Sequence, residues 1–150
     1  MLFRFWQKRA PAVGAIEGAV NRALHRDPRL RDFEAPRIHV HVDRDEIRLS
    51  GAVSTSDARD LAKRLAAEVP GVTRVRNEVR TDADLTKALQ TTLAGNPGTA
   101  DLARESIVFH GVAELRGRAT YDAQLAAKKM ASAIDGVSDV ADYAVWPSAA

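Results

Sequence analysis

The sequence predicts an α+β protein built from two tandem copies of one αββαβ unit. Three observations support this prediction: a globular composition, apolar patterns that switch between helical and strand periods, and the same order of patterns repeated along the chain. Of the 150 residues, 45% are hydrophobic and 28% are charged, with 9 Gly and 6 Pro. This is the composition of a folded domain, not of a disordered or low-complexity chain.

The repeat emerges when the chain is compared with itself. Residues 16–79 match residues 85–144 element by element. At an offset of 69, Ile16, Val20, Leu24, Pro28, Ile38, Val40 and His41 recur as Leu85, Leu89, Leu93, Pro97, Ile107, Phe109 and His110. Gly51 recurs as Gly117 at an offset of 66, so this alignment removes three residues between the two strands of the hairpin. Matches in one register, broken only at loops, indicate a tandem duplication.

Each unit begins with a helix. Ile16, Val20 and Leu24 have the i, i+4, i+8 spacing of one helical face. Asp27-Pro28 ends this helix, because a residue before proline avoids the α region. The corresponding helix of the second unit is expected over Leu85–Leu93.

A β-hairpin follows the helix. Apolar Ile38, Val40 and Val42 alternate with polar Arg37, His39 and His41, which predicts a half-buried strand. Asp43-Arg44-Asp45 forms the turn, and a return strand runs toward Gly51. The second hairpin is expected over Ile107–His110 and Val112–Gly117.

Each unit ends with a helix and a strand. Ser54–Asp57 supplies the cap for the second helix, and Pro70-Gly71 stops it. Val72–Val79 forms the last strand. The corresponding elements of the second unit are expected over Asp122–Ile134 and Val137–Val145.

Three segments are therefore expected: a basic aromatic segment over residues 1–14, unit 1 over 15–81 and unit 2 over 82–147. The connection over residues 80–83 is very short. A domain of about 60 residues buries only about 60% of its unfolded surface, so each unit alone is marginally stable. We expect the two units to dock.

Composition also excludes several classes of function. The absence of Cys excludes disulfides, thiolate metal sites, iron–sulfur clusters and Cys nucleophiles. We find no Gly-rich phosphate loop and no nucleophile motif, so neither an enzyme nor a cofactor is expected. His39, His41 and Asp43 share a strand face, but structural zinc takes four ligands, so no metal site is expected.

From the sequence we expect neither export nor insertion into a membrane. No apolar run approaches the roughly 20 residues of a membrane helix. Arg4, Lys8 and Arg9 interrupt the place where a signal peptide has its apolar core. We expect a cytoplasmic protein, placed at the inner membrane surface; a periplasmic location is the alternative if the chain is a processed form.

Two motifs recur in both units. They are Leu49-Ser-Gly51-Ala-Val53 and Gly71-Val72-Thr-Arg-Val75-Arg-Asn77 in the first, and Leu115-Arg-Gly117-Arg-Ala119 and Gly136-Val137-Ser-Asp-Val140-Ala-Asp142 in the second. In this respect the sequence resembles the BON domain (bacterial osmotically inducible and nodulation family), in two tandem copies. The resemblance implies a three-stranded mixed sheet in each unit, covered on one face by two helices.

The resemblance also implies a non-enzymatic function. Members of the family bind anionic phospholipid, support the envelope under stress, act as periplasmic chaperones, bind potassium or serve as assembly modules in secretins. In lipid-binding members with two units, an aromatic residue that inserts into the bilayer lies at or next to the position of Asp84. This sequence is acidic there.

Basic side chains gather on the outward face of the first predicted sheet. These residues are Arg37, His39, His41, Arg48, Arg74, Arg76 and Arg80. Arginine binds phosphate in a bidentate manner and keeps its charge, so this face suits an anionic surface. The alternative is a solvated face with cross-strand ion pairs such as Arg48 with Glu78.

The N-terminal segment combines aromatic and basic residues. These residues are Phe3, Arg4, Phe5, Trp6, Lys8 and Arg9. Aromatic rings beside cations favour the membrane interface, where they insert at headgroup depth. The alternatives are a frayed terminus or a segment that packs onto the domain.

The outward face of the second sheet is expected to be partly apolar, with Val108, Tyr143 and Val145 in contact with another protein or a second copy. The leading hypothesis is therefore peripheral binding to an anionic phospholipid surface in stress or envelope maintenance. A structural adaptor or chaperone is the alternative, and potassium binding the third possibility. No nucleic acid partner is expected, because the basic face lacks interleaved aromatics.

Overall fold

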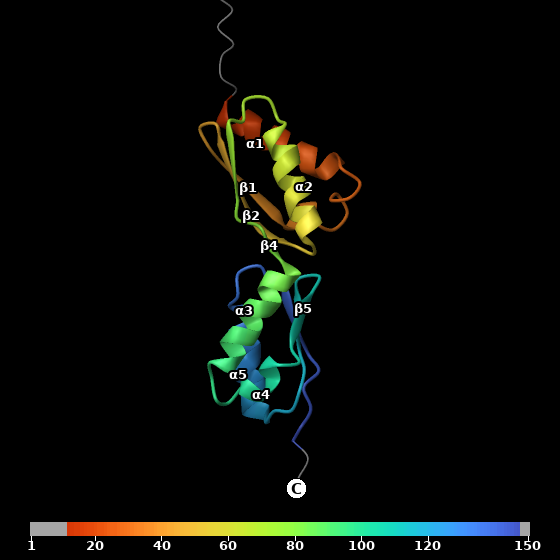
Figure 1. Ribbon diagram of the computed structural model, residues 1–150, viewed down its shortest axis with the longest axis vertical. Coiled ribbons are helices and arrows are strands. Elements are labelled where there is room, and N and C mark those ends of the chain that lie inside the picture. The colour runs from red at the N-terminus through yellow and green to blue at the C-terminus, as the bar shows by residue number, and fades with distance from the viewer. Residues whose placement is uncertain (1–11, 148–150) are drawn as a thin grey trace, which may run out of the picture.

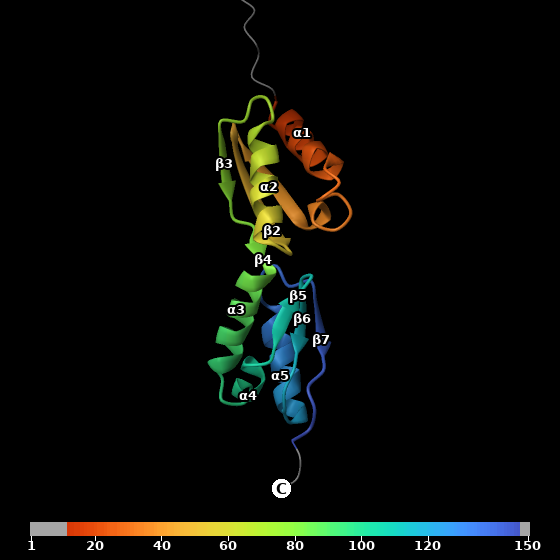
Figure 2. The same ribbon diagram turned by 45° about the vertical axis from the view of Figure 1, so that its right-hand side comes forward.

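The structure, a computed structural model, describes residues 12–147 and places two α+β units end to end (Figure 1). Each unit has one mixed sheet with two longer helices packed against one face (Figure 2). The predicted fold class is confirmed. Hereafter unit 1 is the part from α1 to β4, and unit 2 the part from α3 to β7.

Unit 1 follows the predicted order of elements. They are α1 (Val13–Arg26), the short 3₁₀ helix η1 (Ala35–Arg37), β1 (Ile38–Asp43), β2 (Glu46–Val53), α2 (Ser56–Ala67), β3 (Arg74–Asn77) and β4 (Arg80–Thr81). The strand β2 lies in the centre, antiparallel to β1 and parallel to β3. The short β4 pairs with the end of β2, also in parallel.

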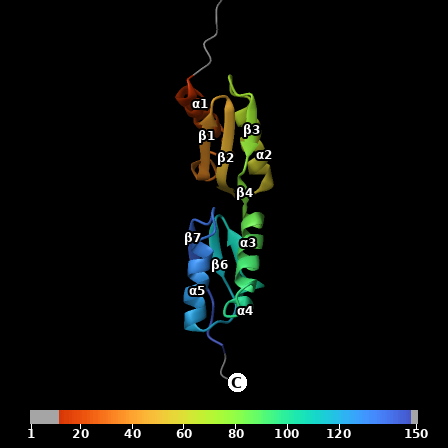
Figure 3. The ribbon, with the colours of Figure 1, turned by 90° about the vertical axis from the view of Figure 1, so that its left-hand side faces the viewer.

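Unit 2 repeats this plan with shorter strands. Its elements are α3 (Asp82–Ala94), the single-turn helix α4 (Ala100–Ala103), β5 (Ile107–Phe109), β6 (Val112–Leu115), α5 (Tyr121–Ser132) and β7 (Asp139–Asp142). The central β6 is antiparallel to β5 and parallel to β7. Figure 3 shows the two sheets with their helices, one unit above the other.

Threonine side chains cap the helices that follow strands. The hydroxyl of Thr55 accepts a hydrogen bond from the N–H of Ala58 at 3.2 Å, and Thr120 caps α5 in the same way. Thr81 forms a complete capping box with Asp84 at the start of α3. Because Thr81 also ends β4, no free linker separates the units.

Each unit has its own apolar core. The core of unit 1 includes Val20, Leu24, Ile47 and Leu49, and that of unit 2 includes Leu85, Leu89, Leu93 and Leu115. These side chains are at most 1% exposed. The helical and strand spacings of the sequence therefore identify the buried faces correctly, with one exception in β5.

In β5 the inward and outward side chains are the reverse of those predicted. Val108 is buried, whereas Ile107 is 37% and Phe109 57% exposed. The hairpin turns show why: Arg44 and His110 both have a positive φ, of 61° and 49°. They therefore occupy equivalent positions at an offset of 66, and the three missing residues lie before β5, not within the hairpin. An odd shift moves every side chain of a strand to the opposite face.

Candidate functional site

The helix-free face of unit 1 carries a row of three basic side chains across its three strands. His41 pairs with Arg48, and Arg48 with Arg76, in the register of the sheet. All three are exposed, as are His39 and Arg74. We call these five residues the basic face. Acidic residues lie among them: Asp43 and Glu46 share the row of Arg74, and Glu78 forms an ion pair with Arg76, 3.0 Å from Nε.

Arg37 and Arg80, also predicted for this face, lie at the junction with unit 2 instead. Arg37 belongs to the turn before β1, and its side chain is only 16% exposed. Its guanidinium lies 3.7 Å from a carboxylate oxygen of Glu34 and 4.0 Å from one of Asp82. Arg80 donates to the backbone carbonyl of Asp135 at 3.1 Å. The prediction that Arg37 points outward from the sheet is wrong, because Arg37 ends the 3₁₀ helix η1 and β1 begins only at Ile38.

The β5–β6 turn of unit 2 faces unit 1 at this junction. The carboxylate of Asp82 accepts hydrogen bonds from the backbone N–H groups of His110 and Gly111, at 2.7 and 3.1 Å. Nδ1 of the His110 ring lies 3.1 Å from the Ser54 hydroxyl, and the ring packs edge-on against Phe33. His110 thus contacts unit 1. The two units are therefore in direct contact. The short linker indicates that they dock but does not show which residues meet.

The helix-free face of unit 2 carries four exposed apolar side chains among polar ones. Phe109, Tyr143 and Val145 are 57%, 60% and 58% exposed, and Ile107 is 37% exposed. We call these four residues the apolar face. Tyr143 and Val145 are exposed as predicted, but Val108 is 5% exposed and packs in the core, so its predicted protein contact is wrong.

The charged side chains Arg116 and Glu114 beside the apolar face pair with each other. Arg116 Nε donates to Glu114 at 3.2 Å, and the same guanidinium lies 5.7 Å from the centre of the Tyr143 ring. A hollow of about 580 Å³ lies beside that ring. It is lined by Glu105, Arg116, Gly117, Arg118, Tyr143 and Val145.

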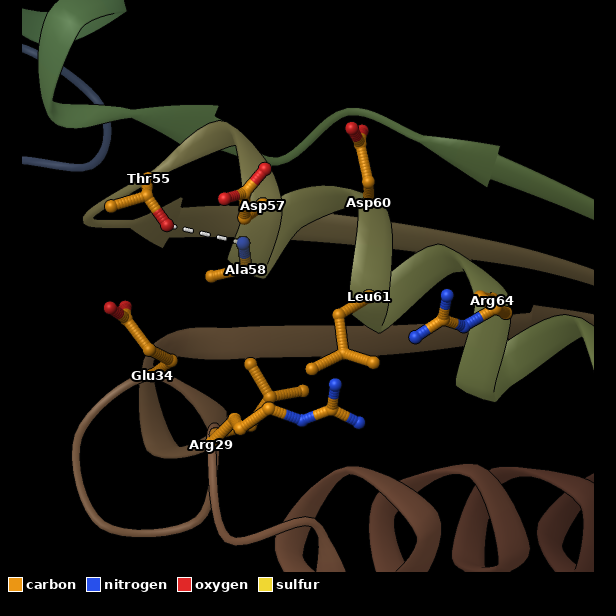
Figure 4. A pocket seen from close by; sticks show the side chains of 9 residues that line it. Arg29, Glu34, Thr55, Asp57, Ala58, Asp60, Leu61 and Arg64 are labelled. Atoms are coloured by element: carbon orange, nitrogen blue, oxygen red, sulfur yellow. Dashed lines mark hydrogen bonds between the residues drawn. The ribbon is translucent and has the colours of Figure 1, made fainter.

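A second hollow, of about 500 Å³, lies between α2 and the loop after α1 (Figure 4). Charges of both signs line it, including Asp57, Asp60 and Arg64. Arg29 is held by Asp27 through bonds of 3.0 and 2.8 Å. Hydrogen bonds from the Arg29 side chain and backbone lower the pKa of Asp27 to about 2. Because acidic and basic side chains both line this hollow, it favours neither an anionic nor a cationic ligand.

The structure shows neither a metal site nor a membrane span in the part it describes. Over residues 12–147, no group of three His, Cys, Asp or Glu is placed to hold a metal ion. Among the same residues, no helix has the length and apolarity needed to cross a bilayer. The predicted insertion residues Phe3, Arg4, Phe5, Trp6, Lys8 and Arg9 lie outside the described residues.

Two repeated mixed sheets, each with one helix-free face, define a tandem α+β protein whose candidate sites are surfaces. The BON domain profile matches residues 12–83 and again residues 81–146. The chain belongs to the BON domain family, in two tandem copies. No curated protein sequence matches it significantly.

Solved structures with a similar fold include CdsD, a structural protein of the type III secretion system of Chlamydia trachomatis. The two structures align with a TM-score of 0.65 and 20% sequence identity, over 89% of this chain and 63% of the CdsD chain. A structure of the CdsD C-terminal domain aligns with a TM-score of 0.59 and 21% sequence identity, over 89% of this chain and 66% of that one. The chain thus spans less than two thirds of either structure.

Proposed function

We propose that this protein is a non-enzymatic binding module that docks a partner protein on the apolar face of unit 2. The carrying observation is that Phe109, Tyr143 and Val145 are each more than half exposed on one helix-free sheet. Exposed apolar area on this scale is costly in water and is typical of protein contacts, in which tyrosine and phenylalanine are enriched.

The repeat provides an internal control for this argument. The positions of unit 1 equivalent to Phe109, Tyr143 and Val145 hold Asp43, Glu78 and Arg80. The fold therefore tolerates charged residues at these places. The fold does not require apolar residues at the positions of Phe109, Tyr143 and Val145, which favours a role in binding.

The similarity to CdsD is consistent with this proposal. CdsD is described as a structural protein of the type III secretion system, and binding to other proteins is consistent with such a role. An assembly role is thus a natural one for the fold, and the apolar face is the surface on this chain that suits it.

Site-specific photo-crosslinking tests the proposal. A photoreactive phenylalanine analogue at Phe109, in the cells that naturally make this protein, should give a discrete crosslinked product, identified by mass spectrometry. The matched control is Tyr121 on α5, which is 58% exposed against 57% for Phe109. Tyr143→Ser should weaken the product at position 109. The same products from positions 109 and 121, or none from either, would overturn the proposal.

Peripheral association with anionic phospholipid, at the cytoplasmic face of the inner membrane, is a second candidate function. The exposed row of His41, Arg48 and Arg76 favours it. Each basic residue close to an anionic bilayer contributes about 1 kcal/mol, which salt screens. The interleaved acids Asp43, Glu46 and Glu78 reduce this attraction.

Vesicle flotation tests this second candidate. The chain should float with vesicles that contain phosphatidylglycerol, and not with phosphatidylcholine vesicles. Arg48→Ser with Arg76→Ser should reduce flotation. Arg31→Ser with Arg104→Ser, which removes the same charge from exposed loops, should not. Equal flotation of the two double variants would contradict a role for the basic face.

A further inference from the structure

The apolar face implies a partner segment with aromatic and basic residues. Tyr143 and Arg116 offer an aromatic ring and a guanidinium beside the 580 Å³ hollow, where a partner's ring can stack. Two exposed acids lie on the two edge strands: Glu105 just before β5, beside the hollow, and Asp139 at the start of β7, in the row of Phe109. Residues 82–150 as a whole hold nine acidic against six basic residues, so unit 2 favours a cationic partner.

This chain itself contains a segment of that chemistry. Residues 1–11 include Phe3, Phe5 and Trp6, which are three of the eight aromatic residues of the protein. They also include Arg4, Lys8 and Arg9, and no acidic residue. We propose that residues 1–11 of one copy dock on the apolar face of a second copy, so that the chains associate head to tail. This inference rests on the proposed function and names its partner.

The geometry favours a second copy over the same molecule. Helix α1 begins at Val13, at the end of unit 1 away from unit 2, as Figures 1 to 3 show. Trp6 is six residues from Ala12 and so reaches about 21 Å at most. The eight residues of β2 alone span about 27 Å from its hairpin to the junction. Trp6 cannot pass unit 1 to reach its own apolar face.

Such a contact joins two different surfaces. Every copy then keeps one unused segment and one unused face, so association continues into a closed ring or an open chain. Aromatic side chains placed in the hollow supply the apolar contact. The cations Arg4, Lys8 and Arg9 add an electrostatic attraction, which salt screens. Association should therefore increase with protein concentration and weaken at high ionic strength.

Complementation between two defective variants tests the proposal in the full chain. Phe5→Ser with Trp6→Ser removes the aromatic anchors, and Phe109→Ser with Tyr143→Ser removes the apolar face. In sedimentation velocity, the unchanged chain should form species larger than two copies at high concentration. Each double variant alone should sediment as one chain of 16.3 kDa. A 1:1 mixture should form dimers and nothing larger, because only one compatible pair of surfaces remains.

A matched control and a folding check accompany the mixture. Tyr121→Ser with Leu125→Ser changes two exposed apolar residues on α5, which are 58% and 41% exposed, and should associate as the unchanged chain does. Thermal unfolding of all variants should show that they remain folded. An unchanged chain that stays monomeric, or a mixture that forms no dimer, would overturn the inference.

The outcomes separate this inference from the function on which it rests. If position 109 crosslinks to a different protein and the mixture stays monomeric, the docking function stands and the head-to-tail inference fails. If position 109 gives no product, both fail. If Phe5→Ser with Trp6→Ser abolishes flotation with phosphatidylglycerol vesicles but leaves self-association unchanged, the segment binds membrane and the inference is overturned.

Discussion

The guanidinium of Arg37 occupies the space that a side chain on Gly111 would fill. A Cβ atom built on Gly111 would lie 2.3 Å from Nη2 of Arg37, and Gly111 has a φ of +78°. Among residues 12–147, neither Nη1 nor Nη2 of Arg37 finds a hydrogen-bond partner, although both are buried. Two carboxylates, Glu34 from unit 1 and Asp82 from unit 2, balance the buried charge. Arg37 and Gly111 are thus part of the contact between the units, together with His110 and Arg80.

Gly111→Ala should loosen this junction. A positive φ costs a residue with a side chain about 1–2 kcal/mol, and the new methyl group would displace Arg37. We expect a lower free energy of unfolding in urea and, in small-angle scattering, a broader distribution of distances between the units. Gly14→Ala is the control, because a Cβ at Gly14 meets no atom of the described residues within 4 Å, so the change should be neutral or slightly stabilising. Equal effects of the two changes would contradict the role of Arg37.

Asp82→Ala should destabilise the β5–β6 turn. It removes the acceptor for the N–H groups of His110 and Gly111 and one of the two carboxylates near Arg37. Hydrogen bonds to charged groups contribute about 1.5–3 kcal/mol each, so a loss of about 3 kcal/mol is expected. Amide hydrogen exchange should accelerate at His110 and Gly111, and Asp82→Asn should have a smaller effect. Unchanged exchange at both amides would contradict this account.

Asp84 should make stability depend on pH in the acid range. The hydrogen bond from the Thr81 backbone N–H is the main cause that lowers the pKa of Asp84, with Arg59 and Arg80 contributing less. A carboxyl group with a lowered pKa in the folded state stabilises the fold above its unfolded pKa and loses this effect as the pH falls through its folded pKa.

The difference in unfolding free energy between the unchanged chain and Asp84→Asn should therefore be constant near neutral pH. It should shrink once the pH falls below about 3.8, the ordinary pKa of the group. Urea unfolding at a series of pH values measures this difference. A difference that stays the same down to pH 2 would contradict the prediction.

Two neighbouring substitutions test the orientation of β5. Val108→Ala removes buried methyl groups from the core of unit 2 and should cost about 2 kcal/mol. Phe109→Ala removes a larger side chain that is 57% exposed, and should cost less than about 1 kcal/mol. Chemical denaturation of both variants measures the difference. The reverse order would support the inward orientation of Phe109 that the simple repeat alignment predicts.

The same pair of residues shows how far sequence periodicity extends. Apolar spacing identified the core positions of the long helices, because a helix of three or four turns contains enough repeats to define one face. The strand β5 has only three residues, all of them apolar. No alternation within it indicates a face, so its orientation depended on where the three missing residues were placed.

The sequence by itself determined the order of elements, the duplication, the family and the exposure of Tyr143 and Val145. Each of these follows from local spacing or from motifs read along the chain. Tertiary structure decided the orientation of β5, through the turn at His110, and moved Arg37 from a sheet face into the contact between the units. The partners of Arg37, such as Asp82, are distant in sequence, and only folding brings such charges within 4 Å of each other.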